Sequence, residues 1–392
     1  MRTIDQFNFK DKKALVRVDF NVPIDNNRVT DNSRIMAAKD TIDKVCNDGG
    51  SCILVSHLGR PQAAEKKYSM LNILCEVEAV FNRKVILSKD IIGHDSTSKA
   101  KNLKSGQILL LENVRFHKEE TQGDIRFAEE LSKLADCFIN DAFGTAHRAH
   151  ASTTLVAQFF KDKFFGKCLE SEVKSIRKVL KNGEKPVLAI LGGAKISTKI
   201  PILKNIIKIA DHIIIGGGMA FTFAKALGGK IGLSIHEDSM LETAKDILDS
   251  STENNVKIHL PIDVVCSLEF SNSSTRKIFD IMNIDNNFQG MDAGPKSLDL
   301  FKNVVSNAKT ILWNGPLGVF EFSNFSNGTK MLGKFISNST KNGAFSLVGG
   351  GDSVSAVKKL NIESQMSYVS TGGGAMLESL EGKNLPGISA LL

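Results

Sequence analysis

The chain has 392 residues, enough for two or three domains with substantial hydrophobic cores. Hydrophobic residues account for 42% and charged residues for 24%, as in ordinary globular proteins, and no apolar run approaches the ~18 residues of a membrane-spanning helix. The net charge of +7 is mild and no basic run is interleaved with aromatic residues, so the composition does not indicate nucleic-acid binding and is compatible with an anionic substrate.

The first residues and the cysteines bear on the compartment. Residues 1–13 alternate charged and apolar side chains, unlike a secretory signal peptide. The cysteines include no C-x-x-C pair, so we expect reduced, mostly buried thiols in a cytoplasmic protein. They are Cys46, Cys52, Cys75, Cys137, Cys168 and Cys266.

Short β-like runs alternate with helix-length segments along the whole chain, which predicts parallel α/β sheets. In the first half the predicted strands are 14–20, 52–57, 84–87, 107–113 and 137–142. In the second half they are 187–191, 212–215, 257–265, 310–314, 345–348 and 368–370. Such sheets bind ligands just beyond the carboxyl ends of their strands.

Basic side chains follow the predicted strands of the first half. Arginine forks bind carboxylate and phosphate oxygens in a bidentate way, so their convergence on one face predicts a site for a small, multiply anionic substrate. Scattered surface arginines and hydrogen-bonded histidines are the alternative. The residues are Arg34, Arg60, Arg115 and Arg148, with His57 and His147.

Two other chemistries have weaker support in the same region. His147 and His150 have the spacing of a metal-ligand pair, but no third ligand with suitable spacing lies nearby. Ser56 and Ser152 lie near histidines, but no Gly-x-Ser-x-Gly elbow of a hydrolase accompanies them.

The segment 185–221 begins the second half with a phosphate-site pattern. A buried strand at 187–191 ends in Gly192-Gly193, and a glycine pair lets backbone N–H groups approach an anion. Pro201 is tolerated in a first helical turn, which places Thr198 near the N-cap, Lys199 in the first turn and Lys195 in the loop. Two cations beside free amides at a helix start form a phosphate site. Solvated lysines at a helix start are the alternative.

Glycine turns follow most strands of the second half. Each one alone fits an ordinary βα turn, whereas five in one half favour binding of phosphates, a base or a ribose against backbone. No Walker A motif, protein-kinase motif set or dinucleotide fingerprint is present. The turns are 192–193, 216–218, 314–316, 349–353 and 372–374.

Two acids of this half have candidate roles. Glu321 is placed to accept ribose hydroxyls, with a surface acid as the alternative. Asp352 is placed to hold Mg²⁺ against phosphates, directly or through water, and an N-cap role is a second interpretation compatible with the first.

Between the halves, residues 165–180 have apolar side chains at helical spacing, and Lys181-Asn182-Gly183 is typical of a helix end. We interpret this segment as an interdomain helix.

Nine segments together resemble the phosphoglycerate kinase family, a family of glycolytic enzymes, along essentially the whole chain. They are VRVDFNVP (16–23), SHLGRP (56–61), LENVRFH (111–117), DAFGTAHRAH (141–150), LGGAKI (191–196), GGGMAFTF (216–223), WNGPLGVFE (313–321), GGGDS (349–353) and STGGGA (370–375). Each is long and their order is that of the family, so a chance match is excluded.

The resemblance implies an α/β fold: two doubly wound parallel-sheet domains that face each other across a cleft, joined by an interdomain helix. The expected division is 1–166 for binding 3-phosphoglycerate or 1,3-bisphosphoglycerate, 167–180 for the helix and 181–380 for binding ADP or ATP with Mg²⁺. Residues 381–392 resemble the family's returning segment, which packs back on the first domain.

The resemblance also assigns site residues. Those matching the substrate site are Asp19, Asn21, Arg34, His57, Arg60, Arg115 and Arg148. Those matching the nucleotide site are Gly193, Lys195, Lys199, Gly217, Asn314, Glu321, Gly350, Gly351, Asp352 and Ser353, with Asp352 at the metal. Arg34, Lys195, Lys199 and Gly373 are the candidates for catalysis.

Three positions depart from the family pattern: Ser353 stands where Thr is usual, Met291 stands near the adenine pocket where another apolar residue is commoner, and Met376 stands where Ser is usual. The position of Met376 is tied to hinge hydrogen bonding in the family, so the details of closure are open.

The implied reaction is phosphoryl transfer from an acyl phosphate to ADP. A carboxylate is already ionised at neutral pH, so no general base is needed, and catalysis rests on positioning and charge neutralisation. Closure of the two domains would bring the substrates in line and exclude water. We expect a monomer with no nucleic-acid or membrane partner.

Two competing hypotheses are a nicotinamide-dependent dehydrogenase and a non-catalytic nucleotide-binding regulator. The missing G-x-G-x-x-G weighs against the first. The second gives no reason to keep Arg34, Lys195 and Lys199 together.

Overall fold

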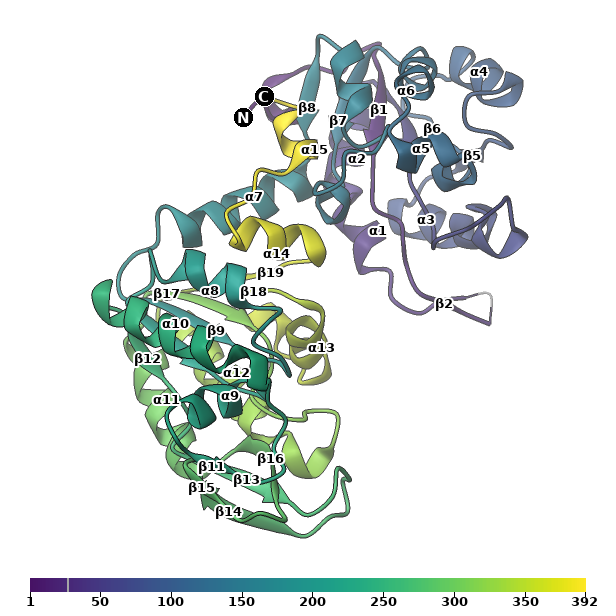
Figure 1. Cartoon of the computed structure of the whole chain (residues 1–392). Helices are drawn as coiled ribbons and strands as arrows, with labels where there is room; N and C mark the ends of the chain where they lie inside the picture. The colour runs from purple at the N-terminus through teal and green to yellow at the C-terminus, as the bar shows by residue number, and fades with distance from the viewer. Residues whose placement is uncertain (27) are drawn as a thin grey trace. The chain divides into compact units, whose positions relative to one another are not determined.

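The computed structural model of the chain describes residues 1–26 and 28–392. It contains two compact units, Met1–Lys174 with Asn384–Leu392, and Ser175–Lys383. Each unit is built on a six-stranded parallel sheet flanked by helices on both faces (Figure 1). Among the described residues, no helix is long and apolar enough to cross a membrane. The expected α/β class with two doubly wound sheets is confirmed.

The sheet of the N-terminal unit has the order β5-β6-β4-β1-β7-β8. Its strands are fully or largely buried because helices cover both faces, as is usual for parallel sheets. In register, Ala14 pairs with Cys52 and Val16 with Leu54, and these four side chains belong to one core cluster. The bounds are β1 Lys13–Arg17, β4 Ser51–Val55, β5 Val85–Leu87, β6 Ile108–Leu110, β7 Cys137–Asn140 and β8 Lys163–Phe165.

Short helices complete this unit. Asp124 caps α6, because its carboxylate accepts the N–H of Phe127 at 2.8 Å, and Phe127, Ala128 and Leu131 form the buried face of that helix. The α-helices are α1 Ser33–Ala37, α2 Lys39–Asn47, α3 Leu71–Phe81, α4 His94–Lys101, α5 Lys118–Gln122, α6 Ile125–Ser132 and α15 Pro386–Ser389. The 3₁₀ helices are η1 Ile4–Gln6, η2 Lys66–Tyr68, η3 Val114–Phe116, η4 Phe143–Thr145 and η5 Leu155–Phe159, and a hairpin pairs β2 Ile24–Asp25 with β3 Arg28–Val29.

The sheet of the C-terminal unit has the order β12-β10-β9-β17-β18-β19. Leu188 pairs with Ile311 and Ile190 with Trp313, and all four side chains lie in one core cluster. Trp313 is fully buried, and its indole N–H donates to the carbonyl of Gly315 at 2.8 Å. The bounds are β9 Val187–Leu191, β10 His212–Ile215, β12 Lys257–His259, β17 Thr310–Asn314, β18 Phe345–Val348 and β19 Tyr368–Val369.

The C-terminal unit also contains smaller elements. Its helices are α8 Ile200–Ile206, α9 Met219–Ala226, η6 Asp238–Met240, α10 Leu241–Glu253, α11 Pro295–Asn307, η7 Ser323–Phe325, α12 Asn327–Lys341, α13 Gly351–Lys359, η8 Glu363–Gln365 and α14 Gly374–Leu380. An antiparallel sheet has the order β14-β13-β16, and β11 pairs with β15. Their bounds are β11 Lys230–Ile231, β13 Asp263–Ser267, β14 Arg276–Asp280, β15 Asn283–Ile284 and β16 Gln289–Ala293.

Helix α7 spans Lys167–Leu180, and the division between the two units falls within it, after Lys174. Its apolar side chains recur at helical spacing and are buried at Leu169, Val173, Ile176 and Val179. The last residues of the chain belong to the N-terminal unit, where the N–H of Gly387 donates to the carbonyl of Ala146 at 2.8 Å.

The expectation of one strand at 257–265 is wrong. The segment forms two strands, β12 in the large parallel sheet and β13 in the antiparallel sheet. Pro261 lies between them and has no N–H to continue a ladder, so the chain leaves one sheet there and enters another. The small antiparallel sheet and β8 were not predicted.

Strand order places one switch point in each large sheet. After β1 the chain continues to β4 on one side, whereas after β7 it continues to β8 on the other side. The same reversal occurs between β9, followed by β10, and β17, followed by β18. Ligands of open α/β sheets bind beyond the strand ends at such points. The ends of β1 and β7, and of β9 and β17, are therefore where each unit is expected to bind.

Candidate functional site

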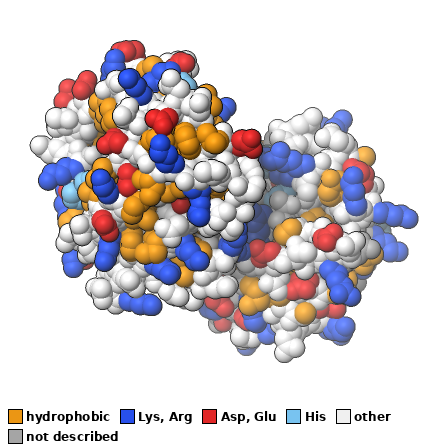
Figure 2. Space-filling model, turned by 90° about the horizontal axis from the view of Figure 1, so that it is seen from below, with side chains coloured by type: hydrophobic (Ala, Val, Ile, Leu, Met, Phe, Trp, Pro, Cys, Tyr) orange, Lys and Arg blue, Asp and Glu red, His pale blue; other side chains and the backbone are white. Residues whose placement is uncertain are grey.

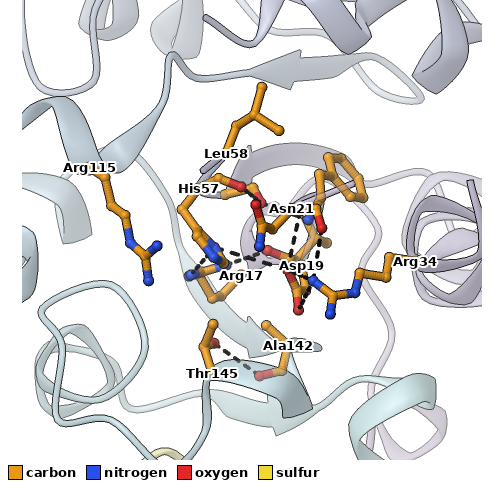
Figure 3. A network of polar contacts seen from close by, with 12 residues as sticks. Arg17, Asp19, Asn21, Arg34, His57, Leu58, Arg115, Ala142 and Thr145 are labelled. Atoms are coloured by element: carbon orange, nitrogen blue, oxygen red, sulfur yellow. Dashed lines mark hydrogen bonds and ion pairs between the residues drawn. The ribbon is translucent and has the colours of Figure 1, made fainter. Parts of the chain in front are cut away.

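The N-terminal cluster is built around Arg17, the last residue of β1 (Figure 3). Its side chain is 1% exposed. The guanidinium lies 3.3 Å from Nδ1 of His57 and donates to Oγ of Ser152 at 3.0 Å and to the carbonyl of Val18. Because a buried cation is costly unless it is paired, its position indicates a specific role in this part of the unit.

Arg34 and Asp19 lie on the other side of His57 (Figure 3). The guanidinium of Arg34 lies 3.4 Å from Oδ2 of Asp19 and donates to the carbonyl of Asn21 at 2.8 Å. Oδ1 of Asp19 lies 4.0 Å from Nδ1 of His57. The predicted residues Asp19, Asn21, Arg34 and His57 therefore come together at the end of β1.

Three further predicted arginines, Arg60, Arg115 and Arg148, line a cavity of about 570 Å³. Gly59 joins this cavity to the Asp19 group. Its N–H donates to Oδ1 of Asn21 at 2.8 Å, and its carbonyl accepts from Arg115 at 2.7 Å. Its φ of +65° suits glycine, and a Cβ there would collide with the ring of Tyr68.

The electrostatics of this cluster are those of an anion site. Burial and the nearby Arg17 and Arg148 lower the pKa of Arg115 to about 10. Burial, Arg17 and Arg115 hold the pKa of His57 well below its ordinary value, so His57 is neutral at pH 7. On the face shown in Figure 2, basic side chains are interspersed with acidic and apolar ones.

Sequence reasoning missed Arg17, Ser152 as its partner, and the buried Glu120. The available signal was a charge inside an otherwise apolar strand, Ala14-Leu15-Val16-Arg17-Val18. Their contacts join positions 135 and 32 residues apart, which no local pattern shows.

Two adjoining cavities lie at the switch point of the C-terminal unit, with volumes of about 340 and 370 Å³. Gly193, Ala194 and Asp352 border both. All ten predicted nucleotide-site residues line one or both of them: Gly193, Lys195, Lys199, Gly217, Asn314, Glu321, Gly350, Gly351, Asp352 and Ser353. The larger cavity is mostly apolar, with Phe221, Phe270 and Met291 in its wall, which suits a flat base.

Glycines make the close approach of β9 and β17 possible. A Cβ on Gly192 would collide with the carbonyl oxygen of Pro316, and Gly315 has a φ of +111°. Asn314 extends from this turn, accepting from Nζ of Lys199 and donating to the carbonyl of Gly349 at 2.7 Å. The strand ends thus hold Lys199 across the smaller cavity.

The expected start of α8 is wrong by one residue. Lys199 is the N-cap and Thr198 precedes it, so Lys199 lies outside the first turn. Thr198 donates instead to the carbonyl of Lys195 at 2.9 Å. Burial lowers the pKa of Lys199, and the charge of Asp352 opposes that shift.

Glu237 is a further residue that sequence reasoning missed. Its carboxylate accepts the N–H of Ser197 at 3.0 Å and the hydroxyl of Ser197 at 2.6 Å. These bonds anchor the loop that carries Lys195.

Asp352 is not an N-cap, so that interpretation is wrong. The N-cap of α13 is Gly350, with a φ of +92°, and Asp352 is the second helical residue. The hydroxyl of Ser353 accepts the N–H of Gly315 at 2.5 Å, so the predicted hydroxyl is held in the turn.

The surroundings of Asp352 suit a Mg²⁺ ion bound together with substrate phosphates better than a metal held by protein side chains alone. The described residues contain no group of three or more His, Cys, Asp or Glu that could hold a metal. Mg²⁺ keeps several waters and is commonly bound by one or two carboxylates together with substrate phosphates. Asp352 is a single carboxylate that borders both cavities, and its charge opposes the lowering of the pKa of Lys199. It therefore has the donor chemistry for that binding mode.

The remaining candidates are placed differently. Gly373 is the N-cap of α14, and it is not among the described residues that line either cavity. Met376 is fully buried, and a Cβ on Gly349 would collide with its sulfur. Ser56 and Ser152 are both fully buried, so neither is placed as an accessible nucleophile.

Together these features define a class: a two-unit α/β protein with an arginine cluster at the strand ends of one sheet and two glycine-lined cavities at those of the other. The family model for phosphoglycerate kinase matches residues 4–383. A phosphoglycerate kinase of Porphyromonas gingivalis is 48% identical over 416 residues, covering 99% of this chain and 99% of that protein. One of Thermosipho africanus is 44% identical, covering 99% and 97%.

Solved structures agree. The phosphoglycerate kinase of Coxiella burnetii matches with a TM-score of 0.91 at 39% identity, covering 99% of this chain and 98% of that one. The enzyme of Pyrococcus horikoshii matches with a TM-score of 0.84 at 29% identity, covering 100% and 98%. The chain belongs to the phosphoglycerate kinase family, and it is therefore a phosphotransferase with a carboxyl group as acceptor.

Proposed function

We propose that the chain transfers a phosphoryl group reversibly from 1,3-bisphosphoglycerate to Mg-ADP, giving 3-phosphoglycerate and ATP. The observation that carries the proposal is the lining of the two C-terminal cavities by all ten predicted nucleotide residues, in a chain whose other unit gathers arginines.

The predicted N-terminal domain, residues 1–166 with the tail 381–392, is proposed to bind the phosphoglycerate. Arg60, Arg115 and Arg148 would hold the phosphate of the substrate, because guanidinium forks match its oxygens. Arg34, held by Asp19 and Asn21, would face the carboxyl end and the transferring group. Neutral His57 would act as a hydrogen-bonding group.

The predicted C-terminal domain, residues 181–380, is proposed to bind the nucleotide. The apolar cavity would take the base, with Glu321 at the ribose, and the glycine turns with Lys195 and Lys199 would take the phosphates. Asp352 would hold Mg²⁺, directly or through water, and the ion would supply neutralisation of phosphate charge.

The chemistry needs little from the protein beyond placement. The acceptor carboxylate is ionised at neutral pH, so no general base is required. Arg34, Lys195, Lys199 and the amides near Gly373 would neutralise charge on the transferring group. Since each ligand site belongs to one compact unit, the proposal includes a closing motion, hinged near the helix 167–180, that aligns the ligands and excludes water.

A cytoplasmic monomer with only small-molecule partners is the remaining part of the proposal. Among the described residues none of the six cysteines forms a disulfide, and four of the six are buried, which suits a reducing compartment. Size-exclusion chromatography with light scattering tests the monomer, and a dimer mass would contradict it.

An assay with 3-phosphoglycerate and Mg-ATP, coupled to detection of ADP, tests the function. We expect ADP formation that depends on both substrates and on Mg²⁺. Absence of turnover in a folded sample would overturn the proposal. Binding of NADH would favour a dehydrogenase, and nucleotide binding without turnover would favour a regulator.

A further inference from the structure

A buried acid lies close to Arg17 and Arg115 of the basic cluster, whose arginines are Arg17, Arg34, Arg60, Arg115 and Arg148. Glu120, on α5, is 1% exposed. Its carboxylate accepts two hydrogen bonds from Ser152, from the N–H at 2.8 Å and from the hydroxyl at 2.7 Å. Oε1 of Glu120 also lies 3.7 Å from Nδ1 of His150.

Ser152 connects this acid to Arg17. The hydroxyl of Ser152 accepts from Nε of Arg17 at 3.0 Å while it donates to Glu120. All three side chains are at most 1% exposed, so the pair of opposite charges and the hydroxyl between them form one enclosed network. A buried charge is tolerated when it is paired and hydrogen-bonded, and this network supplies both conditions.

The network ties together three of the segments that present the cluster. Arg17 ends β1, two residues before Asp19. Glu120 lies in α5, immediately after the 3₁₀ helix η3 that carries Arg115. Ser152 follows the turn that carries Arg148, and the N–H of Ala151 adds a further bond to the carbonyl of Glu120 at 3.0 Å.

The positive charges of the arginines give the network of Arg17, Ser152 and Glu120 an electrostatic role. Arg17, Arg60 and Arg148 all lower the pKa of Arg115, which shows that the cations repel one another, whereas Glu120 acts in the opposite direction. Without a substrate anion, a buried carboxylate offsets part of this repulsion, so the arginines can remain close together before the ligand arrives.

We propose that Glu120 is a positioning residue for phosphoglycerate: through Ser152 and Arg17 it holds the arginine cluster in its binding arrangement without touching the substrate. This inference rests on the proposed function.

Glu120→Gln is the decisive variant, because it keeps size and one acceptor oxygen while it removes the charge. We expect the KM for 3-phosphoglycerate to rise roughly tenfold, the size expected for weakening one charge-assisted contact. The KM for Mg-ATP, whose site is in the other unit, should stay unchanged, as should kcat within about twofold.

Ser152→Ala breaks the same network at its middle. It should raise the KM for 3-phosphoglycerate as well, and the double variant should be little worse than either single one, because both changes remove one connection.

Asp90→Asn is the matched control. Asp90 is a carboxylate of the same unit that also accepts a serine N–H, from Ser96 at 2.9 Å, and its partners in the described part of the chain include no arginine of the cluster. This variant should leave both KM values unchanged, even where its melting temperature falls.

The outcomes separate the two levels of inference. Absence of turnover with 3-phosphoglycerate in the wild type defeats the proposed function. A wild type that is active, with Glu120→Gln raising both KM values equally or neither, defeats the positioning role alone. If Glu120→Gln does not fold, Ser152→Ala decides by the same comparison of KM values.

Discussion

The candidate sites of the two units are built from different groups, side chains in one and mostly backbone in the other. In the N-terminal unit the candidate site consists of side chains, five arginines held by Asp19, Glu120 and hydrogen bonds such as that from Arg34 to the carbonyl of Asn21. In the C-terminal unit it consists largely of backbone, with glycine turns at 192–193, 314–316 and 349–353 and only two lysines.

The proposed ligands differ in size, and this difference accounts for the contrast. A small acid offers few atoms, so affinity must come from strong, directed charge contacts, which require buried counter-ions to hold like charges together. A nucleotide offers a base, a ribose and several phosphates, so backbone amides and an apolar wall suffice. Substitutions should therefore act on one ligand at a time, and four variants test this comparison.

Arg34→Ala should have the largest effect. Loss of one charge-assisted contact is worth ~1.5–3 kcal/mol, so turnover should fall roughly tenfold to over a hundredfold. Affinity for ADP, measured by calorimetry, should change little because the contacts of Arg34 with Asp19 and with the carbonyl of Asn21 belong to the N-terminal site. Near-normal turnover would remove Arg34 from the mechanism.

Lys199→Ala should reduce activity at least about tenfold without weakening the fold. Burial lowers the pKa of Lys199, so at neutral pH its charge costs more free energy in the folded than in the unfolded chain. The melting temperature without ligand should be unchanged or raised, although Asn314 loses a donor.

Mg-ATP should then raise the melting temperature of the wild type more than that of Lys199→Ala. A variant that melts lower without ligand and keeps its activity would make Lys199 a structural residue.

Asp352→Asn should weaken Mg-ATP binding by about tenfold and leave 3-phosphoglycerate binding unchanged. The reason is that the variant removes a negative charge beside the proposed ion but leaves the arginine cluster intact. Calorimetric titration with each ligand alone measures both, and equal losses would assign Asp352 a structural role.

Asp141→Asn should have the smallest effect on activity and a measurable effect on stability. Burial raises the pKa of Asp141 to about 7, and among the described residues its Oδ2 has no hydrogen-bond partner while Oδ1 accepts the N–H of Leu169 at 3.1 Å. Because the pKa of Asp141 is higher in the folded than in the unfolded chain, its carboxyl group contributes to stability at low pH. This contribution is lost as the pH rises toward 7.

The wild type should therefore lose about 2 kcal/mol relative to Asp141→Asn between pH 5 and 7, since each pKa unit corresponds to about 1.4 kcal/mol. Urea unfolding of both proteins at the two pH values measures the difference. A constant difference would show that Asp141 does not titrate in this range.

The predictable part of the fold was local. Strands β9, β10, β17 and β18 have the bounds predicted from their apolar runs, because both faces of each are covered and glycine or a polar residue ends the run. The segment 257–265 was misjudged because its apolar pattern continues through Pro261 while its partners change from one sheet to another.

The candidate site divides in the same way. Motif residues such as Arg115, Lys195 and Asp352 were identified from the sequence because each follows a strand end, and strand ends share an edge. The first residue of each helix was harder to predict from the sequence. The N-caps at Lys199 and Gly350 differ from expectation by one and two residues, because several residues in a row can begin a helix.

By itself, the sequence determined the α/β class, the family and the strand ends that carry the candidate binding residues, because these depend on periodicity, glycine turns and long motifs. Only the tertiary structure decided that Arg17, Ser152 and Glu120 form one buried network and that Glu237 anchors the loop of Lys195. Those contacts join segments far apart in the chain, and their strength comes from burial, a property that a residue acquires only when the surrounding elements have packed around it.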